Sequence, residues 1–234
     1  MSRQQDIESN LKQVRQTIKD LDQQNKVRLV NVSKTKPISD LQIAYDLGER
    51  HFGESYVQEL IEKSEKLPKD VQWHFIGSLQ SNKCKTLAGI QNLFAIETVS
   101  SIKTARALNN HRKELGYGKL NVFLQINTSG EESKSGLSAK LEDILPAVKV
   151  ITGECDYLNL TGLMTIGSSE NSKSGDINPD FELLKKLKEN IDKEFKLSLE
   201  LSMGMSDDYI MAIQQGSTNV RVGSTIFGAR NYNK

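Results

Sequence analysis

The sequence predicts an α/β fold, a single TIM-type (β/α)8 barrel with an extra helix at its N-terminus. Eight strand-like segments alternate with helix-like segments, which is the pattern of a closed parallel barrel. A length of 234 residues is typical of such a barrel when it forms one domain. No G-x-G-x-x-G follows the first strand, which argues against a dinucleotide-binding fold, although the periodicity is also compatible with an open doubly wound sheet. We therefore expect one domain over residues 1–234.

The N-terminal segment and the first β/α unit have the clearest signals. Apolar residues recur at steps of four and three, which predicts an amphipathic helix, at Ile7, Leu11, Val14, Ile18 and Leu21. Residues 27–33 form the first predicted strand, and Pro37 ends it. Ser39 and Gln42 have the spacing of a capping box, so we expect the next helix to begin there.

The alternation then continues to the end of the chain. Strands are predicted near residues 50–52, 72–76, 93–97, 121–127, 157–164, 198–202 and 219–222. Helices are predicted near residues 54–66, 101–115, 140–151, 181–195 and 207–215, with a weaker short helix after Ser81. Residues 168–179 are of low complexity and are interpreted as a flexible loop after the sixth strand.

Composition excludes several classes of protein. The formal charge is 31 minus 30, or +1, so nothing indicates a nucleic-acid partner. The two cysteines, Cys84 and Cys155, do not form a C-x-x-C pair, which argues against a disulfide scaffold and against a cysteine metal site. The polar N-terminus does not resemble a signal peptide, and no apolar run is long enough for a membrane span. We expect a cytoplasmic protein without a metal or a membrane partner.

Several polar residues fall at the ends of predicted strands, where barrel enzymes place their chemistry. Lys34 follows Val30 and Val32 at strand spacing, so these three side chains should face the barrel interior. Asn127 closes the fifth strand, and Arg221 lies in the last strand. His74 closes the third strand, where a lone histidine is more often a hydrogen-bonded core residue than a catalyst.

Two small-residue turns follow the last two strands. Residues 202–208 contain Gly204 and Ser206, which we interpret as a helix-capping serine, and residues 221–225 contain Gly223 and Ser224. Such turns can direct backbone N–H groups at a phosphate dianion. In either turn alone, the glycine could equally serve only to allow a tight turn of the backbone. Together with Lys34, they suggest a phosphate-bearing aldehyde cofactor.

A set of motifs in a fixed order resembles one known family, the pyridoxal phosphate homeostasis proteins, also called the proline synthase co-transcribed family. The resemblance extends over about residues 27–232 and is carried by residues 32–37, 52–59, 73–83, 133–136, 160–164, 204–208 and 221–230. It implies a barrel like the N-terminal domain of alanine racemase. Two positions depart from the usual motifs: Ser55 stands where relatives usually have asparagine, and Ser224 where they often have threonine.

The resemblance also implies the cofactor and its ligands. Pyridoxal 5′-phosphate (PLP) would form an aldimine on Lys34 and not on Lys36, with its phosphate at Ser206, Gly223 and Ser224. Arg221 would face the pyridine nitrogen, and we add Asn127 to the cofactor-binding residues from its place at a strand end.

The expected function is that of a PLP carrier or regulator without catalytic residues. A permanently charged arginine at the ring nitrogen cannot accept a proton, so the ring would be a poor electron sink. Racemases of this barrel type add a β-domain with a catalytic tyrosine, and we expect no such domain here. We expect a monomer that delivers PLP to PLP-dependent apoenzymes. An amino-acid racemase or related enzyme is the alternative, and a purely structural protein is the third.

Overall fold

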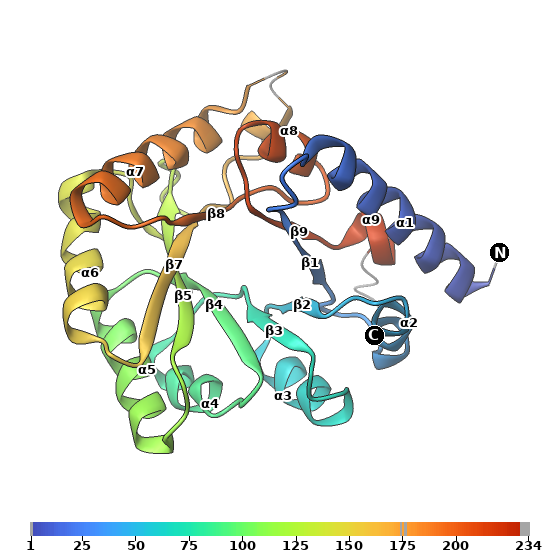
Figure 1. The fold of residues 1–234 in the computed structure, drawn as a ribbon, viewed down its shortest axis with the longest axis horizontal. Helices are drawn as coiled ribbons and strands as arrows, with labels where there is room; N and C mark the ends of the chain where they lie inside the picture. Colours follow the sequence, from blue (N-terminus) through green and yellow to red (C-terminus); the bar gives the residue numbers. More distant parts are fainter. Residues whose placement is uncertain (1, 174, 176, 230–234) are drawn as a thin grey trace.

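In the computed structural model, which describes residues 2–173, 175 and 177–229, eight parallel strands close into a barrel (Figure 1). Each strand pairs with its neighbour, and the last pairs with the first through Val30 opposite Arg221. A two-residue strand, β6 (Leu137–Ser138), adds to β5 outside this ring. The barrel strands are β1 (Arg28–Val32), β2 (His51–Glu54), β3 (Gln72–Phe75), β4 (Leu93–Val99), β5 (Leu120–Asn127), β7 (Leu158–Met164), β8 (Glu200–Ser202) and β9 (Asn219–Val222).

Helices surround the barrel in the alternating order that the sequence predicts (Figure 1). The helices are α1 (Arg3–Leu21), α2 (Ile38–Asp46), α3 (Val57–Lys66), α4 (Cys84–Ala88), α5 (Ile102–Leu115), α6 (Leu141–Glu154), α7 (Pro179–Phe195), α8 (Tyr209–Gln214) and α9 (Ser224–Phe227). Within the described part of the chain, two 3-10 turns occur, at Ser81–Lys83 and Asn171–Lys173. The predicted fold class, a closed parallel barrel with an N-terminal helix, is therefore confirmed.

Some boundaries differ from the prediction for physical reasons. Helix α2 begins after Pro37, which has φ −68° and makes no side-chain cap bond, so the predicted capping box at Ser39 is wrong. Proline suits this position because the first N–H groups of a helix have no partner within it. Glu54 ends β2 instead of opening α3. Strand β6, the turn at 171–173 and α9 were not predicted, since each has only two to four residues.

Helix α1 covers the outside of the barrel next to α2, α8 and α9 (Figure 1). Its predicted apolar stripe is buried at Ile7, Leu11, Val14 and Ile18. Ser2 and Gln5 form a reciprocal capping box at its start. Asn10 Nδ2 donates to the carbonyl oxygen of Ile226 at 3.1 Å, so α1 also supports α9.

The main apolar core lies between the strands and the surrounding helices, and the inside of the barrel is more polar. A small apolar cluster of Ala95, Phe123 and Met164 fills part of the interior. An added Cβ at Gly162 would lie 2.7 Å from the ring of Phe123, so only glycine fits this position. Among the described residues, no helix is both long enough and apolar enough to cross a membrane. Motif residue Arg230 lies outside the described residues.

Candidate functional site

The predicted site residues gather at the carboxyl end of the barrel. Lys34 follows β1, Arg221 lies in β9, and the turn with Gly223 follows β9 directly. Ser206 follows β8, which pairs with β9. Because β8, β9 and β1 are neighbours in the ring, these side chains share one sector of the barrel mouth. Asn127 ends β5, on the other side of β7.

Lys34 occupies a tight turn directly after β1. The backbone N–H of Lys36 donates to the carbonyl oxygen of Ser33 at 3.0 Å, which makes Lys34 and Thr35 the central residues of a β-turn. Thr35 has φ +65°, in the left-handed region that favours glycine. The Lys34 side chain is partly buried. An open pocket of about 960 Å³ adjoins the turn and is lined by Thr35 and Lys36 together with Arg3 and Glu59.

The two small-residue turns meet at the Ser206 hydroxyl. Its oxygen accepts hydrogen bonds from the backbone N–H groups of Gly223 at 3.2 Å and Thr225 at 3.3 Å. An added Cβ at Gly223 would lie 3.1 Å from both the Cβ and the carbonyl oxygen of Val32, so the turn packs closely against the end of β1. The arrangement brings backbone donors and a hydroxyl together beside the end of β1, a combination that can bind an anionic group.

The interpretation of Ser206 as a helix cap is wrong. Helix α8 begins at Tyr209, its N-cap residue is Asp208, and Asp208 Oδ1 accepts the backbone N–H of Met205 at 2.7 Å. The Asp208 side chain therefore bonds within its own turn, and the Ser206 hydroxyl bonds instead to the start of α9. Gly204 has φ +98°, and an added Cβ would lie 2.5 Å from that of Ala212, so this turn requires glycine.

Arg221 is buried in the barrel interior, only 3% exposed. Its Nη1 donates to Ser202 Oγ at 2.6 Å and its Nη2 to the carbonyl oxygen of Thr165 at 2.9 Å. Burial lowers the pKa of Arg221, while the carboxylates of Glu97 and Asp208 oppose that effect. An arginine remains charged in such a setting, so this end of the barrel holds a fixed cation.

Glu97 supplies the negative charge that faces this cation. It is fully buried, and its Oε2 lies 4.0 Å from Arg221 Nη1 and accepts the Ser202 hydroxyl at 2.5 Å. His74 Nδ1 lies 2.7 Å from Oε1, and Asn219 Nδ2 donates to the same oxygen at 3.1 Å. Burial alone would raise the pKa of Glu97, but the hydrogen bond with His74 and the charges of His74 and Arg221 lower it to about 2.

The polar network continues from Glu97 toward the other end of the barrel. His74 is fully buried, and its Nε2 lies 2.8 Å from His51 Nδ1, so the interpretation of His74 as a hydrogen-bonded core histidine is confirmed. Burial, followed by the neighbouring His74 and Arg28, lowers the pKa of His51 to about 3. His51 is therefore neutral at neutral pH. The sequence analysis did not single out Glu97, which lies within β4, two residues before its end.

Asn127 contributes to the rim of the barrel mouth. Its Nδ2 donates to the carbonyl oxygens of Glu131 at 2.9 Å and Lys134 at 3.3 Å, and its Oδ1 accepts the N–H of Gly130 at 3.1 Å. The side chain is therefore engaged in folding the loop after β5. Lys134 in this loop also donates to the carbonyl oxygen of Gly167, which joins it to the loop after β7.

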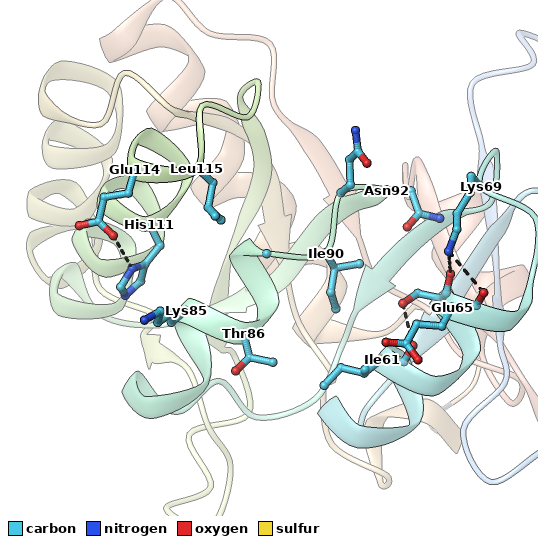
Figure 2. Close-up of a pocket in the computed structure, with 13 residues that line it drawn as sticks. Ile61, Glu65, Lys69, Lys85, Thr86, Ile90, Asn92, His111, Glu114 and Leu115 are labelled. Carbon is cyan, nitrogen blue, oxygen red and sulfur yellow. Dashed lines mark hydrogen bonds and ion pairs between the residues drawn. The ribbon is translucent and has the colours of Figure 1, made fainter.

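A separate pocket of about 570 Å³ lies outside the barrel between α3, α4 and α5 (Figure 2). It is lined by Ile61 from α3, by Ile90 and by Leu115 at the end of α5. Ile90 precedes β4, so this pocket lies toward the amino ends of the strands, away from Lys34. Within the part of the chain that the structure describes, no group of three or more His, Cys, Asp or Glu residues could hold a metal ion.

Comparisons with known proteins place the whole chain among relatives of one kind. The family model "Alanine racemase, N-terminal domain" matches residues 3–231. The chain is 49% identical over 225 residues to the pyridoxal phosphate homeostasis protein of Schizosaccharomyces pombe, covering 96% of this chain and 93% of that one. Identity to the protein of that name from Homo sapiens is 47% over 216 residues, 88% of this chain and 78% of the human one. The structure of PipY from Synechococcus elongatus PCC7942 with PLP bound superposes with a TM-score of 0.74 at 30% identity, covering 91% of this chain and 99% of PipY.

Proposed function

This chain belongs to the pyridoxal phosphate homeostasis protein family, and from that membership we propose that it binds PLP at the barrel mouth and takes part in intracellular PLP homeostasis as a carrier or regulator. The observation that carries the proposal is the meeting of three adjacent strands: β1 leads into the Lys34 turn, β9 holds the buried Arg221 and leads into the turn with the Gly223 N–H, and β8 leads to the Ser206 hydroxyl. A lysine amine can bond an aldehyde, backbone N–H groups can bind a phosphate, and a guanidinium can donate to a pyridine nitrogen.

The residues divide into an attachment group and a phosphate group. Lys34 is the proposed point of covalent attachment, because its amine can bond the aldehyde and Val32, two residues before it at the end of β1, packs against Gly223. Ser206, Gly223 and Ser224 are the proposed phosphate ligands, with the hydroxyl of Ser206 already joined to the backbone that would surround the phosphate. Asn127 is proposed as a further contributor to the cofactor site, and its bonds support a role in shaping the rim.

Arg221 is the proposed partner of the ring nitrogen. PLP supplies an aldehyde that bonds amines and a ring that can withdraw electrons when its nitrogen is protonated. The guanidinium of Arg221 is a donor that cannot accept a proton, and Ser202 and Thr165 hold its orientation. A donor in this position favours an unprotonated ring nitrogen, which disfavours carbanion chemistry. We therefore propose a binding protein with no catalytic residues.

The remaining assignments are also proposals. We propose a single domain over residues 1–234 that acts as a monomer, with PLP-dependent apoenzymes as recipients of the cofactor and no nucleic-acid or membrane partner. A cytoplasmic location is supported by Cys84 and Cys155, both buried and free, as is usual in a reducing compartment.

Titration with PLP tests the binding proposal. Lys34→Ala should abolish the visible absorption band of protein-bound PLP, while Lys36→Ala, two positions along the same turn, should retain it. Loss of the band in Lys36→Ala with retention in Lys34→Ala would overturn the assignment.

The alternative, an amino-acid racemase or related enzyme, takes its support from the alanine racemase family model. Exchange of the Cα proton of L- and D-alanine, serine and lysine with solvent deuterium separates the two functions, with Lys34→Ala as the blank. The carrier proposal expects exchange near the rate of free PLP. Exchange on the order of 1 s⁻¹ or faster that depends on Lys34 would make the protein an enzyme.

A further inference from the structure

We propose that Lys63, Glu54 and Glu59 are positioning residues that hold the Lys34 turn in the conformation required for covalent attachment of the cofactor. The inference rests on the proposed function, because it concerns the same site. It assigns a role to three charged residues outside the set predicted to touch the cofactor.

The center of this cluster is the ammonium group of Lys63, a residue of α3 that is only 4% exposed. Its Nζ donates to Glu54 Oε1 at 2.7 Å, to Glu59 Oε2 at 2.8 Å and to the backbone carbonyl oxygen of Ser33 at 2.8 Å. An ammonium group has three donors, so all three are used. One of them reaches the residue directly before Lys34.

The carboxylates bond to the same turn from two sides. Glu54, fully buried at the end of β2, accepts the Ser33 hydroxyl at 2.6 Å through Oε1. Glu59 in α3 accepts the backbone N–H of Thr35 at 2.9 Å through Oε2. The residues on either side of Lys34 are therefore both bonded to carboxylates that share the Lys63 ammonium group. The cluster joins β2 and α3 to the one turn that carries the attachment lysine.

The backbone of the turn explains why such a hold is required. Thr35 has φ +65° at the third position of the β-turn, where a positive φ favours glycine and is costly for a β-branched residue. A residue keeps such a conformation only when the surrounding structure fixes it. The N–H of Thr35 and the carbonyl oxygen of Ser33 are the backbone groups that Glu59 and Lys63 bind. Without these bonds the turn should relax and the Lys34 amine should change its direction.

The two oxygens of the Glu54 carboxylate have different surroundings. Glu54 Oε2 is buried and has no hydrogen-bond partner, so Oε1 alone accepts from both Lys63 and Ser33. Burial raises the pKa of Glu54 to about 7, against the lowering effects of Lys63 and the Ser33 hydroxyl and with a small raise from Glu59. The cluster therefore places a buried carboxyl group with a raised pKa next to the attachment turn.

The experiment compares covalent with noncovalent binding in the full-length protein. Lys63→Met keeps the length of the side chain and removes its charge. Two readouts are measured: the rate of appearance of the visible band with PLP, and the Kd of 4′-deoxypyridoxine phosphate, which has the ring and the phosphate but no aldehyde. We expect the rate to fall by about tenfold or more and the Kd of the analogue to stay within twofold, since the phosphate ligands are not bonded to Lys63.

Two further comparisons separate positioning from general loss of stability. Leu187→Ala in α7, a buried site distant from the turn in the sequence, serves as a control for destabilisation and should leave the attachment rate within twofold. Glu59→Ala should slow attachment, and Glu59→Gln should restore much of the rate because its amide oxygen can still accept the Thr35 N–H. The Glu59 side chain is 28% exposed, so these variants serve as the test if Lys63→Met does not fold.

The outcomes are distinct. Attachment at the wild-type rate in Lys63→Met or Glu59→Ala, with the wild-type protein binding PLP covalently, would overturn the positioning role alone. An equal loss of rate in Leu187→Ala would also overturn it, because the effect would then follow stability. Failure of the wild-type protein to bind PLP would instead overturn the proposed function.

Discussion

Replacement of Glu97 with glutamine would remove the only charge that faces Arg221 within bonding range among the described residues, while keeping the shape of the side chain. The carboxylate accepts hydrogen bonds from Ser202 at 2.5 Å and from Asn219 at 3.1 Å, and it lies 4.0 Å from the Arg221 guanidinium. All of these groups are buried. The glutamine amide would place a donor against donors, so at least one buried polar group would lose its partner.

The magnitude follows from the pKa of Glu97. A fall from 4.5 to about 2, at 1.36 kcal/mol per pKa unit, corresponds to roughly 3 kcal/mol of stability at neutral pH. This agrees with the loss of about 3–5 kcal/mol usually found when one partner of a buried ion pair is removed. Because the folded-state pKa is the lower one, this stability is present above pH 4.5 and is lost as the pH falls from 4.5 toward 2.

Urea unfolding followed by circular dichroism at pH 7 measures the effect. The matched control is Glu200→Gln, which breaks the ion pair with Arg28 at the other end of the barrel, where both side chains are partly exposed. We expect the unfolding free energy to fall by about 3 kcal/mol in Glu97→Gln and by about 1 kcal/mol or less in the control. Equal losses of unfolding free energy in the two variants, or a loss below 1 kcal/mol for Glu97→Gln, would refute the idea that the Glu97 carboxylate stabilises the buried network of His74 and Arg221.

Three other predictions follow from the site and the N-terminal helix. Ser206→Ala combined with Ser224→Ala should raise the Kd of PLP at least tenfold more than that of pyridoxal, because hydrogen bonds to a charged group contribute roughly 1.5–3 kcal/mol each; equal losses would place the phosphate elsewhere. The pKa of His51 is lowered from 6.5 to about 3, so the unfolded state takes up its proton first and stability falls as the pH drops below 6.5. Between pH 7 and pH 5 the unfolding free energy of His51→Gln, measured with urea, should therefore fall by roughly 2 kcal/mol less than that of the wild type. Parallel plots of unfolding free energy against pH for the two proteins would contradict this. Leu11→Ala should lower the unfolding free energy by about 2–5 kcal/mol and leave the PLP Kd within threefold. A variant that keeps its stability but no longer binds PLP would contradict this.

Periodicity was sufficient to predict the barrel because most of its strands are followed by a segment with a clear helical stripe, although the helices after β3 and β9 are short. Helix α1 is the plainest case, since Ile7, Leu11, Val14 and Ile18 are all buried as the spacing predicts. Elements of two to four residues, such as β6 and α9, have no period to detect. The placement of Lys34 and Arg221 on neighbouring strands also follows from the predicted order, because the last strand of a closed barrel pairs with the first.

The residues that support the site were harder to predict, since their roles depend on contacts between distant segments. Ser206 has the spacing of a helix cap, but Asp208 takes that position and leaves the hydroxyl for α9. Glu97 joins residues from β3, β8 and β9, which no local pattern connects. Lys63 does have a local signal: it is a lysine three residues after the buried Leu60, on the apolar face of α3.

The central claim is that Lys34 is the attachment point of PLP. The most direct measurement is reduction of the PLP-loaded protein with borohydride, followed by digestion and mapping of the labelled peptide by mass spectrometry. We predict that a single pyridoxyl phosphate label will be fixed on Lys34 and that Lys34→Ala will remain unlabelled. A label on Lys36 or Lys83 in the wild-type protein would contradict the assignment.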